Sequence, residues 1–89
     1  MAKHEHEYGL YGLLLARATD APTAPAIAAP GRLTLDYAGL LGQVEDMIRA
    51  LRSHGIQLSE RVAVALPQGP ECLTACLGVA AGAIAVPLN

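Results

Sequence analysis

The chain has few aromatic and few charged side chains. Its 89 residues include no tryptophan and no phenylalanine, the aromatic residues are three tyrosines, and charged residues make up 16%. Lys3 is the only lysine and the net charge is −2, so no basic surface of the kind that binds nucleic acid is expected. Hydrophobic residues nonetheless amount to 53%. We expect part of this apolar surface to be covered by a partner or by further parts of the same protein.

Cysteine is also scarce. The two cysteines, Cys72 and Cys76, are too few for a small disulfide scaffold. Because they lie four residues apart, they share one face if the segment is helical. We predict that both are reduced, small core residues, as suits a cytoplasmic protein. A pair of metal ligands is the alternative, but no histidine lies near them in the sequence.

Two apolar runs resemble targeting or membrane segments. Residues 10–18 end in Ala-x-Ala, but glutamates precede them where a signal peptide has basic residues. Residues 72–88 carry no charge and contain Gly78 and Gly82 in a GxxxG spacing. This run is slightly short for a bilayer span, and Pro87 interrupts it. We therefore predict no membrane span, and a helix followed by a buried strand in the second run.

The first third of the chain combines one helical segment with two extended ones. Residues 8–18 have apolar side chains at helical spacing, which predicts an amphipathic helix. A loop rich in proline and alanine follows. Residues 26–28 and 32–35 then favour short strands, joined by a turn at Pro30 and Gly31.

The clearest helix spans residues 36–55. Apolar residues recur along it at steps of three and one, the period of an amphipathic α-helix. Asp36 can cap its start, and Gly55 can end it in the left-handed conformation. Gly39 and Gly42 each cost about 1 kcal/mol relative to alanine, and we expect close approach of the helix backbone to a neighbour to compensate.

Two apolar segments near the end of the chain predict strands. Residues 62–66 and 83–87 are short apolar runs, of the kind that is covered on both faces of a sheet. Residues 70–81, between them, predict a helix of small side chains. The residues expected on its inward face are Leu73, Cys76, Leu77 and Ala80.

From residue 32 onward, strands alternate with helices. Helical connections imply parallel pairing with right-handed crossovers. The predicted fold class is therefore α/β, with helices packed on a short parallel sheet. We treat residues 1–89 as one unit with three parts: a flexible start (1–7), a helix with short strands (8–35), and a helix–strand–helix–strand part (36–89).

Few residues carry recognisable chemistry. His4 and His6 could bind a metal loosely but lack a third ligand in sequence reach. His54 ends a predicted helix, where it serves more simply as a charge than as a base. The stretch LPQGPE, residues 66–71, has the position of an anion-binding helix start, but Pro70 removes an amide donor. The sequence therefore assigns no catalytic, cofactor-binding or metal-binding residue.

The second half of the chain carries a series of motifs in a fixed order. An acidic residue with Arg-Val-Ala is followed by Leu-Pro-x-Gly-Pro-Glu, by Ala-Gly-Ala after a small-residue helix, and by Val-Pro-Leu-Asn. This order resembles the N-terminal region of the AMP-forming adenylating enzymes. That family includes acyl-CoA synthetases, fatty-acyl-AMP ligases, luciferases and the adenylation domains of peptide synthetases. The matching segments are Glu60–Ala63, Leu66–Glu71, Ala81–Ala83 and Val86–Asn89.

The resemblance extends upstream with two departures. Residues 36–40 are similar to the start of the family's opening helix. Asp36 stands where the family usually has a threonine cap, and Gly39 where it has glutamate, which removes the capping box. The likeness in the order and spacing of elements covers residues 8–89.

The resemblance implies a partial layer of the family's N-terminal domain, whose strands are buried by parts that come later in the chain. It implies an ATP-dependent carboxylic acid–thiol ligase, which forms an acyl-adenylate with Mg²⁺ and passes the acyl group to coenzyme A or a carrier-protein thiol. The family's phosphate loop, ribose-binding residues and catalytic lysine lie downstream of this region. No functional residue is therefore carried over, and the 89 residues alone are expected to be inactive. The motifs lean toward an acyl-CoA synthetase rather than a peptide-synthetase domain.

The alternative is a non-enzymatic, stand-alone α/β module that pairs with a partner through its apolar edge. The two hypotheses differ in the reading frame downstream of Asn89. A Gly/Ser/Thr-rich loop ending in lysine would favour the ligase there, and a native stop codon would favour the module. If 89 residues were the natural length, we would expect self-association that covers the edge strand.

Overall fold

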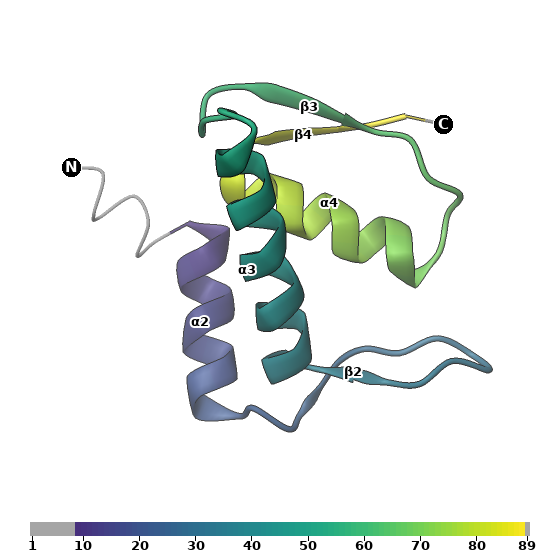
Figure 1. The fold of residues 1–89 in the computed structure, drawn as a ribbon. Coiled ribbons are helices and arrows are strands. Elements are labelled where there is room, and N and C mark those ends of the chain that lie inside the picture. Colours follow the sequence, from purple (N-terminus) through teal and green to yellow (C-terminus); the bar gives the residue numbers. More distant parts are fainter. Residues whose placement is uncertain (1–8, 89) are drawn as a thin grey trace.

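The structure is a computed structural model that describes residues 9–88, which form three helices and two small sheets (Figure 1). The predicted α/β class is confirmed. The flexible start predicted for residues 1–7 lies outside the described residues. In chain order the elements are α2 (Leu10–Asp20), β1 (Pro25–Ile27), β2 (Leu35–Asp36), α3 (Tyr37–Ser53), β3 (Arg61–Val64), α4 (Pro70–Gly82) and β4 (Ile84–Pro87).

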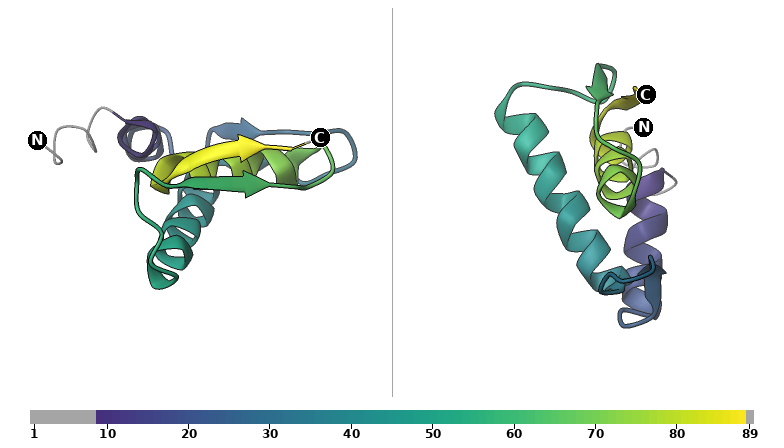
Figure 2. Two further views of the ribbon diagram at one scale, coloured as in Figure 1. Left: turned by 90° about the horizontal axis from the view of Figure 1, so that it is seen from above. Right: turned by 90° about the vertical axis from the view of Figure 1, so that its right-hand side faces the viewer.

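The strands β3 and β4 lie side by side and run in the same direction (Figure 2, left). Their register runs from Arg61 opposite Ile84 to Val64 opposite Pro87. The amide of Leu88 donates to the carbonyl of Val64 at 2.9 Å. Because amides alternate in direction along a strand, the missing N–H of Pro87 falls on the side away from β3, where proline is tolerated. The predicted parallel pairing of the two C-terminal apolar segments, with a helix between them, is confirmed.

The segment at residues 32–35 does not join that sheet, so the prediction of a single parallel sheet beginning there is wrong. Strand β2 pairs antiparallel with β1 instead. The amide of Arg32 donates to the carbonyl of Ala29 at 3.1 Å, and Gly31 has a φ of +72°, as in a type II turn with Pro30 before the glycine. This turn brings β1 beside β2 locally, and β2 has only two residues before α3 begins.

Both ends of α3 are capped as predicted. The carboxylate of Asp36 accepts a hydrogen bond from the amide of Gly39 at 2.8 Å. At the other end, the amide of Ile56 donates to the carbonyl of Leu51 at 2.9 Å, across Gly55 with its φ of +78°. This is the long bond of a Schellman motif, which satisfies a carbonyl in the last turn.

Helix α4 packs across α3 through Gly78 and Gly82. A Cβ atom at Gly78 would lie 2.9 Å from the Cβ of Met47, and a Cβ at Gly82 would lie 3.2 Å from the Cγ1 of Ile48. Gly78 has no room for a side chain unless Met47 shifts, and a side chain at Gly82 would be tighter than ordinary van der Waals contact. The GxxxG spacing in the second apolar run therefore serves close packing of two helices within this fold.

The role predicted for the glycines of α3 is wrong for Gly42, where a Cβ would meet nothing within 4 Å. A Cβ at Gly39 would lie 2.8 Å from the Cδ1 of Leu35, so this glycine does approach a neighbour closely, the side chain of the preceding strand. The close approach between helices falls on the glycines of α4, because tertiary packing decides which face of α3 is covered.

The core lies between the three helices and continues under the β3–β4 sheet. Val44 of α3 is its most completely enclosed side chain, at 0% exposed. One cluster joins α2, α3 and α4, and a second joins α3 and α4 to the sheet. Their buried members are Leu14, Leu40, Val44 and Ala81 in the first cluster, and Leu51, Val64, Val79 and Ala83 in the second.

The inward face predicted for α4 is partly wrong. Leu73 is 49% exposed and Ala80 is exposed, whereas Cys76 and Leu77 are half-buried. The buried residues of α4 are Gly78, Val79, Ala81 and Gly82. The small residues face α3 because the close helix crossing excludes larger ones.

The β3–β4 sheet is covered on one face within the described residues. Val62, Val64 and Ala85 belong to the cluster beneath the sheet. Ile84, whose register partner is Arg61, is 44% exposed on the opposite face. The covering of both faces that the sequence predicts is therefore not supplied by residues 9–88.

Neither apolar run forms a membrane element in the described part of the chain. No helix of residues 9–88 combines the length and the hydropathy that a bilayer crossing needs. The first run forms most of α2, which buries Leu14 and Ala18, and the second forms α4 and β4.

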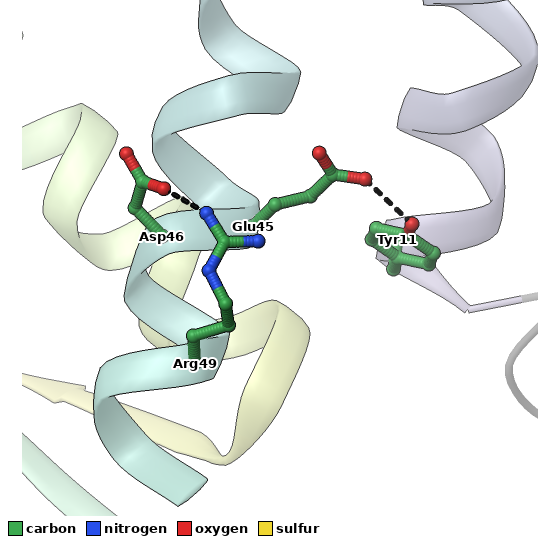
Figure 3. A network of polar contacts seen from close by, with 4 residues as sticks. All are labelled: Tyr11, Glu45, Asp46 and Arg49. Carbon is green, nitrogen blue, oxygen red and sulfur yellow. Dashed lines mark hydrogen bonds and ion pairs between the residues drawn. The ribbon is translucent and has the colours of Figure 1, made fainter. Parts of the chain in front are cut away.

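A partly buried polar contact, called here the clamp, joins α2 to α3. The hydroxyl of Tyr11 donates to Oε2 of Glu45 at 2.8 Å (Figure 3). Arg49, on the next turn of α3, pairs with Asp46. The hydrogen bond to Glu45 raises the pKa of Tyr11, and burial and the Glu45 charge raise it further. The contact with Glu45 thus favours the neutral Tyr11 hydroxyl, which can donate a hydrogen bond, over the ionised form.

The crowding at Gly78 predicts that Gly78→Ala destabilises the chain. The new methyl group must displace the Met47 side chain close to its backbone, and overpacking of this kind costs about 1–3 kcal/mol. Gly42→Ala is the matched control, because it fills open space and gains about 1 kcal/mol of helix propensity. The urea concentration at the midpoint of unfolding should therefore be lower for Gly78→Ala and higher for Gly42→Ala than for the unchanged chain. Equal shifts in both would contradict the packing role of Gly78.

The Tyr11–Glu45 bond predicts a stability contribution that depends on pH. Tyr11→Phe should cost about 1 kcal/mol near neutral pH, the usual value of one hydrogen bond. Since the folded-state pKa of Tyr11 is raised from 10.0, the contribution is complete below pH 10 and is lost as the pH rises through the folded-state value. Denaturation of the unchanged chain and of Tyr11→Phe at a series of pH values from 7 to 11.5 measures the difference in their free energies of unfolding.

Glu45→Gln is the matched control for that series. It keeps an acceptor oxygen but removes the charge, so it should lower the pKa of Tyr11 toward 10.0, as measured by ultraviolet titration of the phenol. A cost of Tyr11→Phe that stays constant across the whole pH range would contradict the clamp.

Candidate functional site

The start of α4 is the one place that the sequence marks as suited to an anion. Gly69 caps the helix with a φ of +154°, and Pro70 occupies the first turn without an amide to donate. The amide of Leu73 is engaged by the carbonyl of Gly69 at 3.1 Å. Glu71 places a carboxylate in the first turn, where it already complements the positive pole of the helix.

An ion pair closes this helix start toward the β1–β2 turn. The guanidinium of Arg32 pairs with the carboxylate of Glu71, and both side chains are more than half exposed. A phosphate at this position would have to displace Glu71 from Arg32 and tolerate its negative charge. The start of α4 is therefore neutralised by the Arg32–Glu71 pair, and its charge does not suit phosphate.

A cleft of about 410 Å³ lies between the β1–β2 turn and the first turns of α4. Its volume is in the range of small-molecule sites. Its walls combine apolar residues with the Arg32–Glu71 pair and contain no histidine, cysteine or lysine. The lining residues are Ile27, Ala29, Gly31, Arg32, Leu33, Leu35, Gln43, Pro70, Glu71 and Thr74.

A second, smaller cavity of about 190 Å³ lies between α2, α3 and α4. Leucines line most of it, and the guanidinium of Arg17 lies 5.4 Å from the ring centre of Tyr37 at its wall. It offers a surface for apolar packing and holds no pair of groups that could move a proton. The lining residues are Leu10, Leu13, Leu14, Arg17, Tyr37, Leu40 and Leu77.

The histidines do not form a site in the described part of the chain. His54 follows the last turn of α3, where its Nδ1 lies 3.0 Å from the carbonyl oxygen of Ala50. Ser53 donates to the same carbonyl at 2.8 Å, so the pair serves the helix end. Within residues 9–88, no three histidine, cysteine or acidic side chains gather as metal ligands would. His4 and His6 lie outside the described residues.

Sequence reasoning missed two long-range polar contacts that the structure describes between residues 9 and 88. Tyr11 and Glu45 are 34 residues apart, and Arg32 and Glu71 are brought together by the β1–β2 turn. No local pattern identifies such partners: Tyr11 alone indicates the apolar stripe of a helix, and Glu71 alone indicates a charge at a helix start. Both contacts hold separate elements together.

The fold and these sites can be compared with known proteins. The sequence profile of the AMP-binding enzyme family matches residues 14–89. An isonitrile lipopeptide synthase of Streptomyces coeruleorubidus is 35% identical over 79 residues, which are 88% of this chain and 5% of that protein. The structure of a Mycobacterium tuberculosis fatty acyl CoA synthetase superposes with a TM-score of 0.78 at 30% identity, covering 91% of this chain and 16% of that one. The structure of the nonribosomal peptide synthetase FmoA3 superposes with a TM-score of 0.80 at 31% identity, covering 90% of this chain and 9% of that one.

The chain thus spans a small part of the length of its relatives. The relatives include both a fatty acyl CoA synthetase and peptide synthetases at closely similar identities. That the chain comes from an acyl-CoA synthetase rather than from a peptide synthetase therefore stays a prediction. The family match spans most of the chain and the structural superpositions cover nine-tenths of it, which together show that the chain belongs to the AMP-binding enzyme family and corresponds to an N-terminal segment of an AMP-forming adenylating enzyme.

Proposed function

We propose that the chain is the N-terminal portion of an ATP-dependent carboxylic acid–thiol ligase. The parent enzyme would join an acid to ATP with Mg²⁺, giving an acyl-adenylate and pyrophosphate, and would then pass the acyl group to coenzyme A or a carrier-protein thiol. The observation that carries the proposal is the family match along residues 14–89, supported by the superposition on a fatty acyl CoA synthetase. ATP-dependent chemistry and unpaired cysteines both suit the reducing cytoplasm.

The 89 residues alone are proposed to be inactive. Adenylate formation needs positive charge held in place around the phosphates of ATP. The described cationic side chains are spread over separate elements, and most of them already have partners. Arg17 lies over Tyr37, Arg32 pairs with Glu71, Arg49 pairs with Asp46, and Arg52 donates to the carbonyl of Ile56 at 2.7 Å.

The test is ATP–pyrophosphate exchange by a chimera. Residues 9–88 would replace the matching segment of the M. tuberculosis fatty acyl CoA synthetase, which is 30% identical over this region. We expect the chimera to exchange pyrophosphate in the presence of a fatty acid, and the 89-residue chain to show no exchange with any acid tested. Turnover by the chain alone would contradict its inactivity. A chimera that folds with the parental melting temperature but lacks exchange would contradict the proposed function.

We also propose that the open face of the β3–β4 sheet is covered by the remainder of the same enzyme chain. Parallel sheets are normally buried on both faces, whereas here Ile84 of β4 and Leu88, just after the strand, are 44% and 49% exposed. The relatives have chains many times longer than this one, which favours this occupant over a second copy. Without that cover, the same face would promote self-association.

The partner proposal predicts two opposite effects of Ile84→Lys. In the 89-residue chain, light scattering should show concentration-dependent association, and Ile84→Lys should weaken it because a charge replaces an exposed apolar contact. In the chimera, the same variant should lower the melting temperature, because the lysine would be buried without a partner. Gln57→Lys, at an exposed loop position, is the matched control and should do neither. A stable monomer at high concentration, or a chimera that tolerates Ile84→Lys as well as Gln57→Lys, would contradict the proposal.

A further inference from the structure

Two thiols lie together on one face of α4. Cys72 and Cys76 are both free, and each is half-buried. They lie within an uninterrupted helix from Pro70 to Gly82, so they are neighbours on its surface at positions i and i+4. Cys76 also packs against the cluster under the sheet, whereas Cys72 lies in the first turn of the helix.

The helix geometry disfavours a disulfide between them. Residues at i and i+4 have Cβ atoms about 5–6 Å apart, whereas a disulfide needs about 3.5–4.5 Å between its Cβ atoms. Direct S–S bonding would therefore distort the first half of α4. A single bridging atom that bonds to both sulfurs adds length, since even a metal–sulfur bond measures about 2.3 Å. The spacing suits a bridged pair of thiols better than a directly bonded one.

The number of thiols restricts what the bridging atom is. No third histidine, cysteine or acidic side chain joins the two sulfurs among residues 9–88, so a four-coordinate structural zinc site is not formed. A monosubstituted trivalent arsenical needs two thiols, because an organic group already fills its third valence. We propose that Cys72 and Cys76 form a chelating site for monosubstituted trivalent arsenicals. Helix α4 holds the two thiols at the i, i+4 spacing that the site needs.

The reaction balances without an oxidant. The hydrated arsenical carries two As–OH groups; two As–S bonds form, two As–O bonds break, and the two thiol protons leave with the oxygens as two molecules of water. Arsenic stays trivalent and the sulfurs are not oxidised. Burial raises the pKa of the Cys76 thiol, and Cys72 raises it further through a hydrogen bond and charge repulsion. This direction suits a reaction that starts from the protonated Cys76 thiol and transfers its proton to the leaving oxygen.

The experiment uses phenylarsine oxide and the 89-residue chain. We expect native mass spectrometry to show one phenylarsenic group per chain, and thiol titration to show the loss of both free thiols. The dithiol 2,3-dimercaptopropanol should release the arsenical, whereas excess glutathione should not. Cys72→Ser and Cys76→Ser should each bind about 100-fold more weakly, the scale of effect that a linked second contact usually gives.

A spacing control separates the helical site from the mere presence of two thiols. The double variant Cys72→Ser with Thr74→Cys keeps two cysteines but places them at i and i+2, which do not face each other on a helix. It should bind as weakly as the single variants in buffer, and should regain tight binding in concentrated urea, where the helix is lost. Circular dichroism checks that each variant is helical in buffer. Native-like affinity of this variant in buffer, or of either single variant, would overturn the proposal, as would formation of a disulfide in place of the adduct.

Discussion

The close contact between α3 and α4 is the constraint on which the rest of the structure depends. Gly78 and Gly82 let the backbone of α4 approach the side chains of Met47 and Ile48. The same crossing encloses Val44 completely. Since α4 is also the connection between β3 and β4, its position fixes where the parallel strands lie. A larger residue at either glycine would therefore disturb both the helix pair and the sheet above it.

The remaining contacts place the other elements around that helix pair. Helix α2 is held against α3 by Leu14 in the core and by the Tyr11–Glu45 bond at the surface. The β1–β2 turn reaches α4 through the Arg32–Glu71 pair. Exposed ion pairs contribute at most about 1 kcal/mol, so the apolar core provides most of the stability. The segment makes up a small fraction of the length of its relatives.

The sequence by itself determined the three helices, their ends and the family. Helical periodicity, the Asp36 cap, the Gly55 end and the turn at Gly31 depend on residues close together in the chain, and all four are present in the structure. The motif order from residue 60 onward is sufficient to identify the adenylating-enzyme family. The parallel pairing of the two C-terminal strands is predictable as well, because a helix connects them.

The tertiary structure decided what local patterns cannot encode. It placed the close helix contact on the glycines of α4 rather than on Gly39 and Gly42, and it removed β2 from the parallel sheet. It brought Arg32 to Glu71, which turned a candidate anion site into a neutralised helix end. In each case the outcome depends on which surfaces meet, and that is set by packing between segments far apart in the chain.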